Sequence, residues 1–152
     1  MKTLARERDR EEVLRRLRLL RPDSVRLWGR MSAPQMVCHL ADAFRMLIDQ
    51  LPVSLATGLP QRTVMKWAAL YLPVPWPRGI LTRPEIDQEI GGTKPGGFAA
   101  DVAAVEVLVD RVIAGIGTLD GRVHPIFGAM SERAWLRWGY LHMDHHLRQF
   151  GI

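Results

Sequence analysis

Residues 131–150 read SERAWLRWGYLHMDHHLRQF, and their spacing predicts an amphipathic helix that points two histidines into a protein core. An α-helix turns by about 100° per residue. At that angle one side is charged and should face water, since it carries Arg133, Arg137, Asp144 and Arg148. The opposite side carries Trp135, Gly139, His142 and His146. Ser131 is a typical N-cap and Gly151 a typical C-terminal cap, so both ends of the helix are marked.

Three further stretches have apolar residues at helical spacing, at about 4–20, 32–50 and 98–116. Their buried stripes are expected to be Val13, Leu14, Leu17 and Leu20 in the first; Met36, Leu40, Ala43, Phe44, Leu47 and Leu51 in the second; and Val102, Val105, Val109, Val112 and Ile116 in the third. Ser32 is a good N-cap for the second, with Pro34 in its first turn. Four long amphipathic helices without a convincing alternating strand predict an all-α protein, a four-helix bundle.

Residues 51–97 differ from the rest of the chain, because they hold seven of its ten prolines and the glycine-rich run Gly91–Gly97. We expect a short extra helix at about 61–72 between helices two and three, and otherwise irregular chain that crosses over the bundle. The order of glycine, lysine and threonine in the run is wrong for a phosphate-binding loop, so the run is interpreted as a flexible connection.

The bulk composition indicates an ordinary folded protein, expected to form a single domain over 1–152. The chain has 47% hydrophobic residues and one cysteine, its residues 1–21 are charged throughout and lack the apolar stretch of a signal peptide, and no apolar run is long enough for a membrane span. These features predict a cytoplasmic location. The net charge is +5, and much of it comes from arginines in residues 6–21. Acidic residues alternate with these arginines, which is typical of a solvated helix face with i,i+4 ion pairs. Nucleic-acid binding is therefore not expected.

His142 and His146 carry the strongest functional signal, because i,i+4 spacing places both rings on one helix face. Two buried imidazoles need polar partners, and a shared cation supplies them. A third ligand must come from another helix, and His39 is the only histidine in the first 120 residues. A purely structural histidine cluster is the alternative. His145 is a rival ligand, interpreted here as supporting the site or lying at a helix–helix seam.

Three other polar residues lie near this pattern without an assigned role as ligands. His124 precedes the last helix in a turn and could line the mouth of a pocket. Gln149 lies one turn beyond His146 and could orient a ligand or a bound water. Cys38 is expected to point about 100° away from His39, toward solvent, and is not assigned as a ligand.

Two segments resemble the DinB-like family of metal-binding four-helix bundles. One is MSAPQMVCHLAD at 31–42, and the other is HMDHHLRQFG at 142–151. The HPIFG turn at 124–128 and the DHHLRQFG ending are similar to those of an uncharacterised branch of that family. The resemblance implies that His39, His142 and His146 bind one metal ion, and that the chain forms a homodimer. Three nitrogen ligands with open coordination positions suit a divalent transition metal, namely zinc, nickel or iron. The resemblance carries no role to other residues, and the long 51–97 segment departs from the family pattern.

The resemblance also implies a small-molecule substrate and two kinds of enzyme. Characterised relatives include transferases and isomerases that use low-molecular-weight thiols, and others are described as metal-dependent hydrolases. A three-histidine metal site could activate a thiol or a water in either case. Asp42 and Asp144 are both expected to point away from the metal-facing sides, which leaves no convincing general base. A non-catalytic metal or small-ligand binding module is therefore the second hypothesis.

Overall fold

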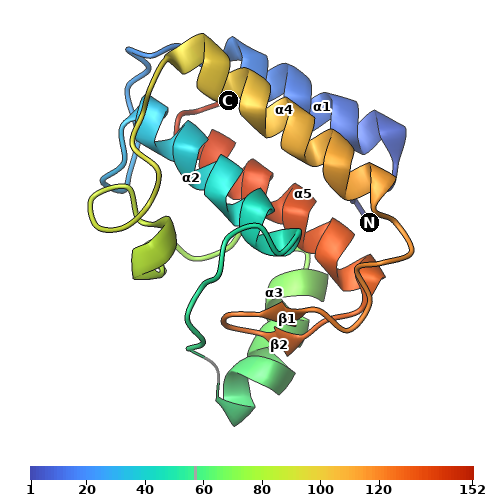
Figure 1. Cartoon of the computed structure of the whole chain (residues 1–152). Helices are drawn as coiled ribbons and strands as arrows, with labels where there is room; N and C mark the ends of the chain where they lie inside the picture. The colour runs from blue at the N-terminus through green and yellow to red at the C-terminus, as the bar shows by residue number, and fades with distance from the viewer. Residues whose placement is uncertain (57) are drawn as a thin grey trace.

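Four long helices form the body of the protein in a computed structural model, which describes residues 1–56 and 58–152. They are α1 (Glu7–Leu19), α2 (Ala33–Leu47), α4 (Phe98–Ala114) and α5 (Glu132–Arg148). Around the bundle α1 packs on α5, α5 on α2, α2 on α4, and α4 on α1 (Figure 1). The predicted all-α four-helix bundle is confirmed.

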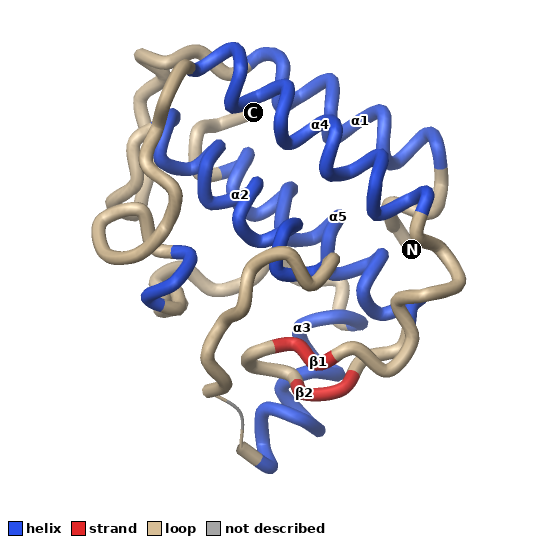
Figure 2. Tube along the Cα trace, in the orientation of Figure 1, coloured by secondary structure: helices blue, strands red, loops and turns tan. Residues whose placement is uncertain are grey.

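The chain direction explains why a long connection is present. In Figure 1, α2 and α4 run side by side in the same direction, while α1 and α5 run the opposite way. Parallel neighbours cannot be joined by a tight turn, so the chain must return along the bundle before α4 begins. That return is the segment between Leu47 and Phe98, largely loop in Figure 2. It contains a π-helical turn, η1 (Gln61–Met65), the predicted extra helix α3 (Lys66–Tyr71) and a 3-10 turn, η2 (Pro84–Ile86).

Local sequence signals account for the starts of the two helices that carry the histidines. At α2, Ser32 Oγ accepts a hydrogen bond from Gln35 N at 3.4 Å, and Gln35 Oε1 accepts from Ser32 N at 2.8 Å. This reciprocal capping box satisfies two donors that a helix start otherwise leaves free. At α5, Ser131 Oγ accepts from Ala134 N at 3.3 Å. Both predicted N-caps are confirmed.

A glycine sets the close approach of α5 to α2. Gly139 is buried in the middle of α5, and a Cβ there would lie 2.6 Å from Leu4 Cδ1 and 3.3 Å from Phe44 Cε1 of α2. Any larger residue would force one of these two fully buried side chains to move. The small residue therefore keeps the helix faces near enough for side chains on α2 and α5 to meet one turn further along.

Three expectations are corrected by the structure. A two-stranded hairpin is present, in which β1 (Val123–His124) pairs antiparallel with β2 (Gly128–Ala129). Strands of two residues are too short to show alternation in sequence. Ile116 is 46% exposed, because α4 ends at Ala114 before reaching it. Arg137 is buried instead of facing water, because the N-terminal segment and the end of α3 cover its side of α5.

No helix within 1–56 or 58–152 combines the length and the apolar character required to cross a bilayer.

Candidate metal centre

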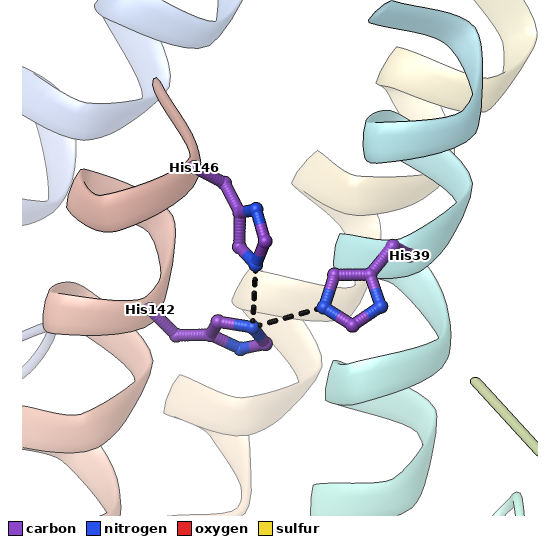
Figure 3. A group of neighbouring side chains, drawn as sticks. All are labelled: His39, His142 and His146. Atoms are coloured by element: carbon purple, nitrogen blue, oxygen red, sulfur yellow. Dashed lines mark hydrogen bonds between the residues drawn. The ribbon is translucent and has the colours of Figure 1, made fainter. Parts of the chain in front are cut away.

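Three imidazoles from two helices meet inside the bundle. His39 comes from α2, and His142 and His146 come from successive turns of α5 (Figure 3). His142 Nε2 lies 3.1 Å from His39 Nε2 and 3.1 Å from His146 Nε2. All three residues are buried, and their candidate ligand atoms lie within 4.8 Å of one another. The structure thus brings together the three histidines singled out in the sequence, and places His145 and His124 outside the cluster.

Hydrogen bonds on the far side of two rings set their tautomers. His39 Nδ1 lies 2.8 Å from the carbonyl oxygen of Ile86 in η2. A carbonyl oxygen only accepts, so Nδ1 of His39 carries the proton and donates it. Its Nε2 therefore presents a lone pair to the cluster. The carbonyl of Ile86 is a main-chain group, so no residue type in the sequence could have marked it as the partner of His39.

Gln149 accepts a hydrogen bond from Nδ1 of His146, as the Ile86 carbonyl does from Nδ1 of His39. Its Nε2 donates to the carbonyl oxygen of Trp28 at 2.9 Å, which leaves Oε1 to accept from His146 Nδ1 at 3.2 Å. The loop around Trp28 packs tightly against Gln149, since a Cβ at Gly29 would lie 2.2 Å from Gln149 Nε2. Gly29 also has φ +79°, a conformation that glycine adopts without strain. The expected position of Gln149, one turn beyond His146 on the inward side, agrees with this hydrogen bond, and the lone pair of His146 Nε2 also points inward.

The three rings cannot satisfy all of their ring nitrogens by hydrogen bonding to one another. Two lone pairs, from His39 and His146, face His142 Nε2, and a neutral ring has at most one proton there to donate. One of the two 3.1 Å contacts is therefore left without a hydrogen. His142 Nδ1 is also buried, and it has no hydrogen-bond partner among the described residues. A positive charge between the three Nε2 atoms would satisfy all three lone pairs together.

The electrostatics favour neutral rings at this position. Burial, followed by the neighbouring imidazoles, holds the pKa of His142 well below the ordinary value of 6.5. Burial also lowers the pKa of His146 well below that value, and it lowers the pKa of His39. Neutral imidazole is the form that binds metals, so the ligand atoms need no further deprotonation near neutral pH.

Two of the three nitrogen separations fit ligation of one divalent transition metal. Ligand nitrogens at about 2.0–2.1 Å from an ion lie roughly 2.8–3.4 Å apart in octahedral (cis) or tetrahedral geometry. The separations of His142 Nε2 from His39 Nε2 and from His146 Nε2, both 3.1 Å, fall within that range. Outer hydrogen bonds to a carbonyl or an amide are typical of histidine ligands, and His39 and His146 both have one. Three histidines could therefore hold an ion here and leave its remaining coordination positions open.

The open side of the cluster faces an apolar cavity of about 390 Å³. All three histidines line it, with walls from α3, the 72–86 segment, the hairpin and α5. Among the described residues no aspartate or glutamate lines this cavity. The expectation that Asp42 points away from the cluster agrees with its bonds, because its carboxylate accepts from Gln88 Nε2, from Thr93 N and from Thr93 Oγ1 at 2.7–3.0 Å. These bonds also tie the glycine-rich run to α2, at Thr93.

His145 and His124 line the same cavity in different surroundings. His145 lies between Trp28 and Trp76, with ring centroids 4.8 and 5.8 Å away, and burial lowers its pKa to about 4. The expected helix–helix seam is not what the structure shows, because His145 lies between α5 and two loops. His124 is buried at the start of the hairpin, where Nδ1 accepts from Ile126 N at 3.1 Å and Phe127 N at 3.2 Å. Burial lowers the pKa of His124 to about 3.

Cys38 does not face solvent as expected, but it lies outside the histidine cluster as expected. It is buried and not turned toward solvent, because α4 packs over that side of α2 and brings Asp101 beside the thiol. Burial, followed by the Asp101 carboxylate, raises the pKa of Cys38 to about 11. A thiol with so high a pKa is a poor nucleophile and a poor ligand at neutral pH. Cys38 is also not a member of the three-histidine cluster.

The fold and the site together define a class: a helical bundle with a buried three-histidine cluster that opens into an apolar cavity. Within that class the chain belongs to the DUF1569 family, whose model, described as a protein of unknown function, matches residues 4–151. No curated protein and no solved structure matches the chain significantly.

Proposed function

We propose that the protein is a metal-dependent enzyme of the DinB-like type, with His39, His142 and His146 as the ligands of one zinc, nickel or ferrous ion. The observation that carries the proposal is the inward lone pairs of His39 and His146 at a buried cluster that faces a cavity. When bound, a divalent ion supplies Lewis-acid chemistry that lowers the pKa of a water or a thiol. The proposed reaction class is transfer of a low-molecular-weight thiol to an electrophile, and hydrolysis is its rival.

The residues around the cluster support chemistry on a small, largely apolar substrate. Trp76, Trp138 and Phe127 line the cavity, and Trp76 is held by a hydrogen bond from Nε1 to the Ala69 carbonyl at 2.7 Å. Apolar walls exclude water and strengthen electrostatic interactions inside the site. His39 and His146 contribute rigid lone pairs, because their other ring nitrogens are already bonded. The cavity of about 390 Å³ suits a small molecule and not a polymer.

A non-catalytic metal or small-ligand module is the second candidate, and one observation favours it. No carboxylate from the described residues reaches the cavity, and His124 Nδ1 is occupied by two main-chain N–H groups. His145, with its pKa lowered to about 4, is a weak base. The described residues that line the cavity therefore offer no general base, and an enzyme of this kind would depend on the ion to acidify the nucleophile.

The test combines metal analysis with a turnover assay. The protein is stripped with a chelator, reloaded separately with Zn²⁺, Ni²⁺ and Fe²⁺, and incubated with a panel of low-molecular-weight thiols plus an aryl halide, and with aryl esters. Turnover that needs the ion and is lost in His146→Ala, but kept in the exposed control Arg133→Gln on the same helix, supports the enzyme. One equivalent of metal without turnover in either assay supports the binding module. Less than roughly a tenth of an equivalent of every metal would contradict both.

A homodimer is also proposed, on the family resemblance and on exposed apolar side chains beside the cavity. Val64, Trp67 and Leu81 are 71%, 58% and 88% exposed in the single chain. Burying such residues against a second copy would remove apolar surface from water. Light scattering at several protein concentrations tests this directly, and a constant monomer mass would contradict it.

A further inference from the structure

A second hollow lies beside the three-histidine cavity and has a different character. This cleft, with a volume of about 690 Å³, is bordered by the 72–78 segment, α5, Trp28 and the N-terminal segment. Trp76 and His145 line both hollows, so they form a shared wall between them. Four cationic side chains line the cleft, against one carboxylate: Lys2, Arg78, Arg137 and Arg148, against Asp144. None of them is a member of the histidine cluster.

Arg137 is the unusual residue of the cleft. It is 8% exposed, and its guanidinium donates from Nε to the Leu70 carbonyl and from Nη1 to the Lys2 carbonyl, the latter at 2.7 Å. Neither partner is charged, and Nη2 has no hydrogen bond to any described residue. A buried cation without a counter-ion is unfavourable, because main-chain dipoles replace only part of its hydration. The guanidinium is held rigidly at the cleft with its charge uncompensated.

The carboxylates nearby are already used by other cations. Asp144 accepts from Arg16 Nη1 at 2.7 Å, and it lies 3.8 Å from Arg148 Nη1. Glu12 pairs with Lys2. Arg78 has no ion pair in the described parts of the chain, and its guanidinium lies 5.4 Å from the ring centroid of Trp28. Arg78 and Arg137 therefore both keep an unneutralised positive charge at the cleft.

The walls of the cleft supply apolar surface around these charges. Trp28, Trp76 and Tyr140 line it together with Leu27, Leu72 and Val74. Leu27 and Val74 are 69% and 59% exposed, so they offer area that a ligand would bury. A guanidinium recognises carboxylate and phosphate groups through two parallel N–H donors. Aromatic and aliphatic walls beside it select an anion that carries an apolar body.

We propose that this cleft binds a small organic anion, with its carboxylate or phosphate group at Arg137 and Arg78 and its apolar body against Trp28 and Trp76. The site is separate from the three histidines, and the proposal does not depend on whether they hold an ion. A ligand in the cleft would lie across the Trp76–His145 wall from the cavity.

The test is titration calorimetry of the full chain with benzoate, phenyl phosphate, inorganic phosphate and the neutral analogue benzamide. We expect saturable binding of benzoate or phenyl phosphate, at least roughly tenfold tighter than benzamide and inorganic phosphate, with the same affinity in chelator-treated and metal-loaded protein. Arg78→Gln changes an exposed residue that should not affect folding, and it should weaken binding roughly 3- to 10-fold. Arg137→Lys should weaken it more than tenfold, and circular dichroism checks that this variant folds.

Arg133→Gln is the matched control, since Arg133 is exposed on α5 and does not line the cleft. No saturable binding of either aromatic anion would overturn the proposal. Equal affinity for benzamide would overturn the role of charge, and equal affinity for inorganic phosphate would overturn the role of the apolar walls. Binding unchanged in Arg78→Gln and in a folded Arg137→Lys would place the anion elsewhere and would overturn the assignment.

Discussion

His124 and His142 are both buried imidazoles that line the same cavity, and they differ in what surrounds their ring nitrogens. His124 Nδ1 accepts two main-chain N–H groups of its own turn, and its ring stacks on Phe127 with centroids 4.8 Å apart. His142 has two other imidazoles at Nε2 and no partner at Nδ1. Burial lowers the pKa of both, so a low pKa does not by itself identify a functional histidine. What distinguishes His124 from His142 is the set of partners around their ring nitrogens.

The HPIFG motif at 124–128 forms the turn of the hairpin, so its role is structural. His124 is the acceptor that closes the turn, and Gly128 has φ +68° at the start of β2. A side chain that completes its own loop has no lone pair left for a ligand at that nitrogen. The cluster of His39, His142 and His146 is the reverse case, since His142 Nε2 faces two other imidazole nitrogens and His142 Nδ1 has no hydrogen-bond partner among the described residues.

The largest effect should follow from removing the central ring. His142→Ala is expected to weaken metal binding more than roughly 100-fold, because it takes away one of the three proposed ligands. His124→Asn should keep full metal stoichiometry. Elemental analysis after reconstitution, with competition against a chromogenic chelator, measures both. Equal metal loss in the two variants would remove the distinction between the two kinds of buried histidine.

Removing the group that orients His146 should have an intermediate effect. Gln149→Leu leaves Nδ1 of His146 without its 3.2 Å acceptor, and loss of such partners weakens metal affinity roughly 10- to 100-fold. Gln149→Glu, which keeps an acceptor, should bind metal more tightly than Gln149→Leu. The chelator competition assay separates the three proteins. An unchanged affinity in Gln149→Leu would show that the tautomer of His146 does not depend on this contact.

The pH dependence of stability should report His124 separately from the cluster. Its pKa is about 3 in the fold and near 6.5 when unfolded, so protonation favours the unfolded chain as pH falls from about 6.5 toward 3. His124→Asn keeps an acceptor and removes the titration. The free energy of unfolding of both metal-free proteins should fall between pH 7 and pH 5. The fall should be about 2 kcal/mol smaller in His124→Asn than in the parent. Urea unfolding at both pH values measures the difference, and parallel losses would contradict a neutral buried His124.

The smallest effect is expected at the histidine next to the cluster. His145→Gln should leave the metal stoichiometry unchanged and shift the affinity less than roughly threefold, because His145 contributes no atom to the cluster. His145 contacts Trp28 and Trp76, so a modest loss of stability is compatible with this expectation. A loss of metal as large as in His142→Ala would make His145 the third ligand in place of His39.

Helix periodicity predicted that Arg137 faces water, but the residue is buried. Arg133 and Arg148 on the same predicted face are exposed, as amphipathic spacing implies. Arg137 lies between them and is covered by the Leu70 and Lys2 carbonyls, from segments 67 and 135 residues away in the chain. Cys38 was misplaced for the same reason, since the packing of α4 on α2 cannot be read from the periodicity of either helix.

The sequence alone determined the four helices, the caps at Ser32 and Ser131, and the three histidines that the fold brings together. These follow from interactions between residues near one another in the chain, or from one strong spacing, and such signals survive without tertiary information. Only the tertiary structure decided that the Ile86 carbonyl orients His39, that His124 is part of its own turn, and that Arg137 is buried beside a cleft. Each of these depends on a main-chain group or a covering segment distant in sequence, and a residue type records neither.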